Sequence, residues 1–160
     1  MKVTALLANH AEAINNLLYT SGGGITQAIV PPNAPAPFGV QLSLAVIVSI
    51  PWTQTNQNHK LRVDLIDADG RTVVLPSGPE STEPFRAELQ FNVGRPPTLQ
   101  VGEEQSVALA IGMPGLPFPG LGRYRFVLYI DETQVDELPF SIGTQPGITV
   151  GVGPTQLPHL

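Results

Sequence analysis

Histidine and carboxylate side chains, the groups that most often bind metals or transfer protons, are thinly spread along this sequence of 160 residues. The three histidines, His10, His59 and His159, lie in separate segments. Only His10 has a candidate co-ligand at strand spacing, Glu12, and two ligands do not complete a metal site. We therefore expect no metal site, and we interpret the histidines as surface imidazoles in loops and at strand edges.

The stretch Asp67-Ala-Asp-Gly70 matches the opening of a calcium-binding loop. A complete loop needs further oxygen ligands and a glutamate at its twelfth position. Here the fifth position is Arg71 and the twelfth is Gly78, so a cation would stand among the ligands. The same four residues are typical of a hairpin turn, and this is the interpretation that we prefer.

Three consecutive glycines, Gly22 to Gly24, raise the question of a phosphate-binding loop. Such a loop normally opens a helix and continues with Lys and Ser or Thr. In this sequence the β-branched segment 25–30 follows, Pro31 ends it, and no lysine is near. We interpret the glycines as a bend or bulge where a strand crosses between two sheets.

Residue patterns for nucleophilic or acid–base catalysis are also missing. The chain has no cysteine and no Gly-x-Ser-x-Gly motif. Adjacent carboxylates occur at Glu103 and Glu104 and at Asp131 and Glu132, but both pairs lie at expected turns, where no pocket would shift a pKa. We predict that the chain is not an enzyme and that it uses no cofactor.

Charge and hydropathy limit the partners and the location. Eight Lys and Arg stand against thirteen Asp and Glu, with a net charge of −5 and no basic cluster, so we expect no binding to nucleic acid. No segment approaches the roughly 18 apolar residues of a membrane span, and the apolar run 3–8 is shorter than the core of a signal peptide. We expect a cytoplasmic protein that does not contact a membrane, which the lack of cysteine suits.

Hydrophobic periodicity predicts an all-β domain. Apolar and polar residues alternate without interruption over 85–93, which is typical of a half-buried strand. Segment 40–50 carries no charge on either face, so we expect a central strand covered on both sides. The predicted strands lie near 40–50, 60–67, 72–75, 85–93, 105–111, 122–130 and 135–142.

Both ends of the chain add to this domain. Asn15 and Asn16 separate the apolar segments 3–14 and 17–20, and Asn tolerates a left-handed backbone, so we predict an extra N-terminal hairpin. A short helix over 11–18 is the alternative. We expect the sandwich domain to span 1–143 and the residues 144–160, which are rich in Gly and Pro, to form a C-terminal tail.

The order of these strands resembles an immunoglobulin-like sandwich of two antiparallel sheets. The resemblance implies one sheet made of the N-terminal strand, 40–50, 85–93 and 105–111. It implies a second sheet made of 60–67, 72–75, 122–130 and 135–142. It also places Tyr124 at the tyrosine-corner position near the start of the sixth strand. Phe126 stands where antibody domains carry their second cysteine, so the likeness is to the broad architecture.

The whole chain also resembles an uncharacterised family of small, mostly actinobacterial proteins. This likeness rests on the start Met1-Lys-Val-Thr-x-Leu-Leu, on Gly22-Gly-Gly24 and on Gly122-Arg-Tyr124. It implies a sandwich fold, but it brings no activity and no catalytic residues.

Two apolar segments are candidate binding surfaces. Segment 113–121 is rich in proline, so we expect a loop that cannot pair as a strand and that either plugs one end of the sandwich or is displayed to a partner. In the tail, apolar residues alternate with small or polar ones and could add to a sheet edge of this chain or of a neighbour. The side chains concerned are Met113, Leu116, Phe118, Leu121, Ile148, Val150 and Val152.

These observations favour a non-catalytic β-sandwich that acts by binding protein, as an accessory or structural assembly component. The tail could link copies into a homo-oligomer, and a structural role in a phage or another particle fits the same class. The alternative is a carbohydrate-binding module, in which Trp52 and the amides and hydroxyls of 53–58 would form an aromatic platform with polar neighbours.

Overall fold

The computed structural model describes residues 1–76 and 83–145, and it consists almost entirely of β-strands. The elements are β1 (Lys2–Ile14), β2 (Leu17–Gly23), β3 (Gln27–Val30), β4 (Phe38–Pro51), the 3-10 turn η1 (Trp52–Gln54), β5 (Asn58–Asp67), β6 (Arg86–Asn92), β7 (Glu104–Phe118), β8 (Gly122–Ile130) and β9 (Thr133–Thr144). The all-β prediction is confirmed.

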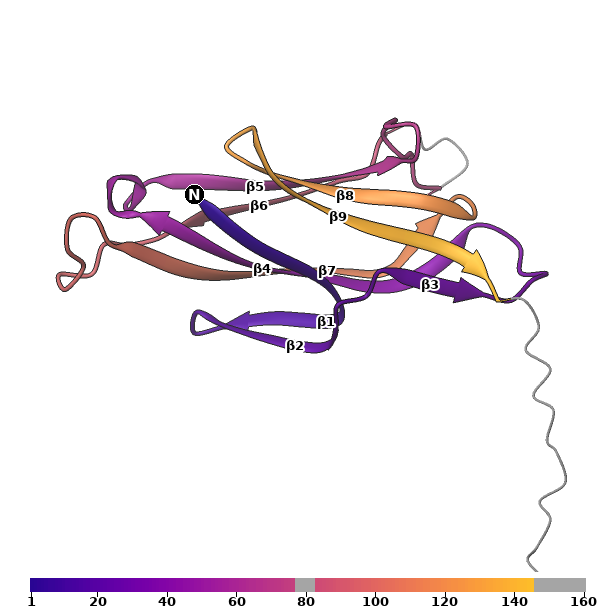
Figure 1. Ribbon diagram of the computed structural model, residues 1–160, viewed down its shortest axis with the longest axis horizontal. Coiled ribbons are helices and arrows are strands. Elements are labelled where there is room, and N and C mark those ends of the chain that lie inside the picture. The colour runs from indigo at the N-terminus through magenta and orange to yellow at the C-terminus, as the bar shows by residue number, and fades with distance from the viewer. Residues whose placement is uncertain (77–82, 146–160) are drawn as a thin grey trace, which may run out of the picture.

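These strands form two sheets that pack against each other (Figure 1). The first sheet has four antiparallel strands in the order β2-β1-β4-β7. The second has five strands in the order β3-β9-β8-β5-β6 and curls into a half-barrel. Because β3 pairs in parallel with β9, the second sheet is mixed, which differs from the antiparallel sheet that the sequence predicts.

The core lies between the two sheets. On the inner face of β4, alternate residues such as Leu44, Val46 and Val48 are fully buried. Aromatic rings from the two sheets meet here: the centroid of Phe118 lies 5.2 Å from that of Phe140 and 6.4 Å from that of Phe126. This apolar contact is what joins the layers.

Two predicted strands are placed differently in the structure. β6 covers the expected segment 85–93, but it pairs with β5 in the five-stranded sheet and not in the other sheet. Segment 72–75 makes only isolated bridges, although the predicted turn before it is formed, with Gly70 N donating to Asp67 O at 3.1 Å. Alternation reveals a strand and its buried face, but the pairing partner depends on residues far away in the sequence.

The prediction that segment 113–121 is a loop is wrong for 113–118, which belong to β7, whereas 119–121 form the turn before β8. β7 continues to Phe118 and pairs with β4 from Met113, opposite Leu42, to Phe118, opposite Phe38. Its prolines are tolerated because β7 is the outer strand of its sheet, where a missing N–H need not break a ladder. Met113, Leu116 and Phe118 are buried, and of the four predicted side chains in this segment only Leu121 is exposed.

The N-terminal hairpin forms as predicted. Asn15 and Asn16 adopt left-handed backbone angles, with φ of 51° and 61°, in the two-residue turn between β1 and β2. β1 pairs with β4 only as far as Ala8, opposite Ser43, and from there onwards it pairs with β2. The hairpin therefore leaves the ladder of β4 and lies below β4 and β7 in Figure 1.

The tip of this hairpin is attached to the outer edge of β7. Asn16 Nδ2 donates to Ser106 O at 2.9 Å, and Ala108 N donates to Asn16 Oδ1 at 2.9 Å. The amide side chain of Asn16 thus makes hydrogen bonds to one backbone donor and one backbone acceptor of β7, which a neighbouring strand could otherwise bind. On the outer face of β4, Ser43 and Ala45 are buried but Gln41 and Ile47 are exposed, so the prediction of a strand covered on both sides holds for the middle of β4 only.

The glycine stretch is a bend between sheets, as predicted. The chain leaves β2 in the first sheet and enters β3 in the second, and Gly22 and Gly24 have φ of 62° and 87°. A Cβ atom at Gly22 would collide with the side chain of Asn9. Both the left-handed backbone and the close contact require glycine at this position.

We predict that Asn16→Gly loosens the hairpin tip from β7. Glycine keeps the left-handed backbone but removes both side-chain hydrogen bonds, so we expect a loss of about 1 kcal/mol in the free energy of unfolding and faster amide hydrogen exchange at Ala108. Asn15→Gly is the matched control, because the Asn15 side chain makes no hydrogen bond to the described part of the chain. Equal exchange at Ala108 in the two variants would contradict this attachment.

Candidate functional site

The outer side of the β1–β2 hairpin exposes large apolar side chains. Ile14 lies opposite Leu17, and Glu12 lies opposite Tyr19, so these four residues share one face of the hairpin. Ile14, Leu17 and Tyr19 are 47%, 59% and 49% exposed. We call these three residues the hairpin face. The other side of the hairpin, which includes the buried Ala11, lies against β4 and β7.

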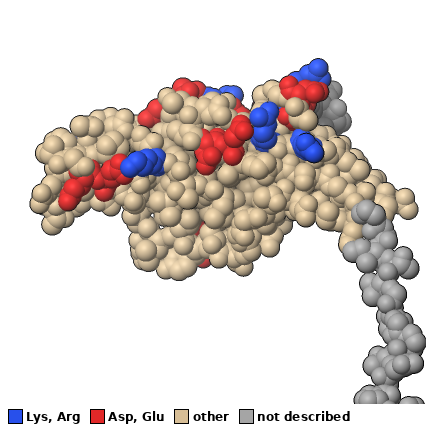
Figure 2. Space-filling model, in the orientation of Figure 1, with Lys and Arg blue, Asp and Glu red and all other residues tan. Residues whose placement is uncertain are grey.

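Few charges surround the hairpin face. The strands of the four-stranded sheet carry only Lys2, Glu12 and Glu104. In Figure 2 hardly any Lys, Arg, Asp or Glu is visible where the hairpin lies. Ile47 on β4 is also exposed, and it pairs with Ala108, whose N–H binds the hairpin tip. This side of the molecule is therefore apolar and nearly uncharged.

The five-stranded sheet has the opposite character. Its charged residues are Lys60, Arg62, Asp64, Asp67, Arg86, Glu88, Arg123, Arg125, Asp136 and Glu137. Asp64, which is buried, binds two of the cations: its Oδ1 lies 3.0 Å from Arg86 Nε and its Oδ2 lies 3.2 Å from Arg62 Nε. Burial opposes the charge of Arg62, but Asp64 and Glu132 outweigh it and raise the pKa of this guanidinium. These charges neutralise one another, so the cluster ties strands together.

His59 is buried, with 4% of its surface exposed, so the interpretation as a surface imidazole is wrong for this residue. Its Nδ1 lies 2.7 Å from Asp131 Oδ2 and its Nε2 lies 2.8 Å from Gln54 O. Gln54 O is an acceptor, and so is the ionised carboxylate of Asp131. The His59 ring can donate to both of them only when Nδ1 and Nε2 each carry a proton. This contact fixes the β8–β9 turn against the start of β5.

The pKa of Asp131 reflects this arrangement. Burial raises it, but the hydrogen bonds from the His59 ring and from the Lys60 N–H, which is 3.0 Å from Asp131 Oδ1, outweigh burial and hold the pKa below its ordinary value. Among residues 1–76 and 83–145, no group of three or more His, Asp or Glu side chains could hold a metal ion. The contacts of Asp131 with His59 and with Lys60 N join the β8–β9 turn to β5.

One face of the Trp52 indole ring is covered by Arg95. The guanidinium carbon of Arg95 lies 3.6 Å from the centroid of the indole ring. The same side chain donates to Trp52 O at 2.9 Å and to Thr55 Oγ1 at 2.8 Å. One face of the ring is occupied by an anchored cation, and a sugar could stack there only by displacing it.

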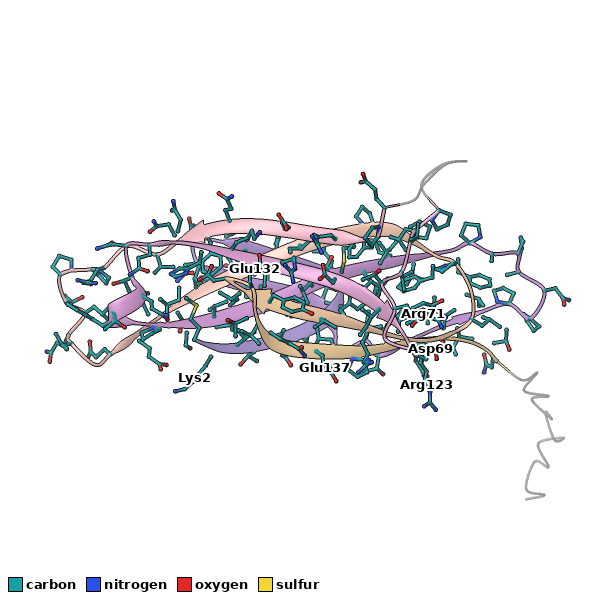
Figure 3. The ribbon with its side chains drawn as sticks, turned by 90° about the horizontal axis from the view of Figure 1, so that it is seen from above. Lys2, Asp69, Arg71, Arg123, Glu132 and Glu137 are labelled. Atoms are coloured by element: carbon teal, nitrogen blue, oxygen red, sulfur yellow. The ribbon has the colours of Figure 1, made fainter. Side chains whose placement is uncertain are left out.

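A surface hollow of about 460 Å³ lies on the five-stranded sheet. Its lining includes Thr26, Asp67, Arg123, Arg125 and Ser141. Two of these charges are already engaged: Arg125 pairs with Glu137 at 3.5 Å, and Asp67 Oδ1 accepts from two N–H groups of its own turn. Figure 3 shows Asp69, Arg71 and Arg123 in the same half of the molecule, away from Glu132. The third charged residue of the lining, Arg123, makes no ion pair within the described residues, so its guanidinium is the charge that the hollow offers to a ligand.

The structure brings few of the predicted binding residues to the surface. Leu121 is exposed at the end of the β7–β8 turn, directly before β8, whereas Ile148, Val150 and Val152 lie outside the described residues. The hairpin face was not among the predictions. Its signal was weak, because Leu18, between Leu17 and Tyr19, is also apolar, and because Ile14 shares its side of β1 with polar residues. In the part of the chain that the structure covers, no helix is long and apolar enough to cross a membrane.

We predict that Asp131→Asn lowers stability near neutral pH and has less effect in acid. Asparagine accepts the left-handed φ of 47° at this position but carries no charge. Because the folded-state pKa of Asp131 is depressed, its contribution is present above the unfolded pKa of about 4 and is lost as the pH falls through the folded-state pKa. Urea unfolding at pH values from 6 to 3 measures the free energy of unfolding of the original protein and of the variant. The difference between the two should narrow as the pH falls, and a constant difference would contradict the ionic contact.

The comparisons with known proteins place the chain in a family without defining an activity. Neither a curated protein nor a solved structure matches the sequence. A family model described as a family of unknown function (DUF6941) matches residues 3–143. The match runs from the second residue of β1 to the penultimate residue of β9, so it includes the hairpin and both sheets. The chain therefore belongs to this family of unknown function.

Proposed function

We propose that this protein acts by binding other proteins, as a non-catalytic accessory or assembly component, and that it binds through the hairpin face. The observation that carries the proposal is the exposure of Ile14, Leu17 and Tyr19 together on one side of the hairpin. Contiguous exposed apolar side chains mark interaction sites on soluble proteins. Depletion of charge and the presence of an aromatic residue are also typical of the centre of protein interfaces.

The attachment of the hairpin supports the same role. Its tip is bound to β7 through Asn16, and its base is held by Gly24 N and Ile25 N, which both donate to Leu7 O, at 2.8 and 3.1 Å. A surface held at both ends loses little conformational freedom when it binds. An unattached two-stranded hairpin would be marginally stable in water and would lose more.

We also propose that the sandwich is immunoglobulin-like. The order β1-β4-β7 in one sheet and β9-β8-β5-β6 in the other corresponds to strands A, B and E and to strands G, F, C and C′ of such domains. The hydroxyl of Tyr124 donates to Gly120 O at 2.7 Å, which is the hydrogen bond of a tyrosine corner. In this assignment β2 and the second half of β1 are additions to the common strands, and an added element is a reasonable place for a specific function.

Leu17→Glu tests the hairpin face. It places a charge at the centre of the proposed contact, so we expect partner binding to weaken by about tenfold or more, with an unchanged fold. The full chain and the variant are purified with bound proteins from the organism that encodes them, and the partner's affinity is then measured with both. Val101→Glu is the matched control, because Val101 is 79% exposed and lies in the β6–β7 loop.

A protein that the control retains and that Leu17→Glu loses would support the proposal. If both variants bound a partner with the same affinity as the original chain, the hairpin face would not be the binding surface. Circular dichroism and a melting curve for each variant separate lost binding from lost folding.

A further inference from the structure

The two sheets have four outer strands, and three of them carry features that prevent pairing with another chain. The outer edge of β7 is occupied by Asn16 at Ser106 and Ala108. β3 has only four residues and is followed by Pro31. β6 carries Arg86 and Glu88. Short length, proline, charge and covering by another segment are the usual protections of a sheet edge.

The fourth outer strand, β2, has none of these protections. Its seven residues, Leu17–Gly23, include no charged residue and no proline. Within the described residues β2 pairs only with β1. The first four residues of β2 are exposed or half-buried, and two of them, Tyr19 and Thr20, are residue types that are common in strands. An exposed apolar edge of this kind is a site at which another strand pairs.

The free hydrogen-bonding groups of β2 follow from the hairpin geometry. In a two-residue hairpin the closing pair, here Ile14 and Leu17, exchanges backbone hydrogen bonds. Backbone groups alternate in direction along a strand, so the N–H and C=O groups of Leu18 and Thr20 point towards the open edge. They define a short ladder of two donors and two acceptors.

We infer that β2 pairs with β2 of a second copy of this chain, antiparallel and around a two-fold axis at Tyr19. Leu18 of each copy then lies opposite Thr20 of the other, and four backbone hydrogen bonds form between the copies. The two four-stranded sheets become one continuous sheet. This inference rests on the proposed function, since it names a second copy as the partner that the hairpin binds.

Charge and side-chain fit favour a second copy as the occupant. Each chain carries a net charge of −5, which opposes self-association, so a contact between two copies needs a surface with little charge. β2 has no charged residue, and Glu12, opposite Tyr19 on β1, is the one charged side chain on the same face of the hairpin strands. Around the axis Tyr19 meets Tyr19 in a pair without hydrogen bonds, where side chains are closest, and Leu17 meets Ser21. The pairing uses residues 17–21 and ends before Gly22, whose left-handed backbone interrupts the strand.

The first test is the solution mass of the full chain by sedimentation equilibrium over a range of concentrations. We expect a dimer of twice 17.0 kDa that dissociates on dilution. Thr20→Pro removes one N–H from the open edge of each copy, so we expect dimerisation to weaken by about tenfold or more. Thr20→Val keeps the N–H and serves as the matched control.

A second test does not depend on how well the proline variant folds. The chain has no cysteine, so Tyr19→Cys creates a single thiol on the proposed axis. Residues opposite each other without hydrogen bonds have Cα atoms about 4.5 Å apart, which a disulfide can bridge. Under mild oxidation we expect Tyr19→Cys to form covalent dimers much faster than Val101→Cys, which is exposed elsewhere.

A monomer at every concentration, or equal cross-linking of the two cysteine variants, would overturn the inference. The proposed function would survive that result if Leu17→Glu still abolished binding of a foreign protein. A dimer that Thr20→Pro leaves intact, together with slow cross-linking at residue 19, would place self-association elsewhere. If Leu17→Glu changed neither the dimer nor any foreign binding, the hairpin face itself would be excluded.

Discussion

The side chain of Asn16 takes the place of a missing strand at the edge of β7, and the arrangement of the first sheet depends on this contact. It holds the tip of the hairpin over β4, so the small residues Ser43 and Ala45 are buried on the outer face of that strand. It also closes one of the four sheet edges. Because the hairpin is fixed in this position, its other side and the strand β2 remain open to solvent.

The two sheets differ in how many charged residues they carry. The five-stranded sheet carries most of the charge of the strands, and part of this charge is paired around Asp64 and the Asp131 turn. These clusters specify how strands and turns meet, and their charges are already neutralised by their partners. The four-stranded sheet is almost uncharged outside as well as inside. This asymmetry is what makes binding of another protein, and not of a charged small molecule, the function that the surface supports best.

Local patterns predict some elements of this structure well and others poorly. The alternation over 122–130 and the turn at Asn15 and Asn16 depend on neighbouring residues, and both were predicted correctly. Three other features depend on contacts between residues far apart in the sequence, so local patterns did not reveal them. They are the pairing of β6 with β5, the burial of His59 beside a turn 72 residues away, and the strand through 113–118. The hairpin face was missed because the apolar residues on both sides of the turn are consecutive, so only the contacts of the hairpin with β4 and β7 decide which side is exposed.

The open edge of β2 is the central claim of this account, and hydrogen exchange of its amides at increasing protein concentration tests it most directly. If two copies pair there, the N–H groups of Leu18 and Thr20 will exchange more slowly as the concentration rises. Those of Tyr19 and Ser21, which already face β1, will change less. Exchange rates at Leu18 and Thr20 that do not depend on concentration would contradict the claim.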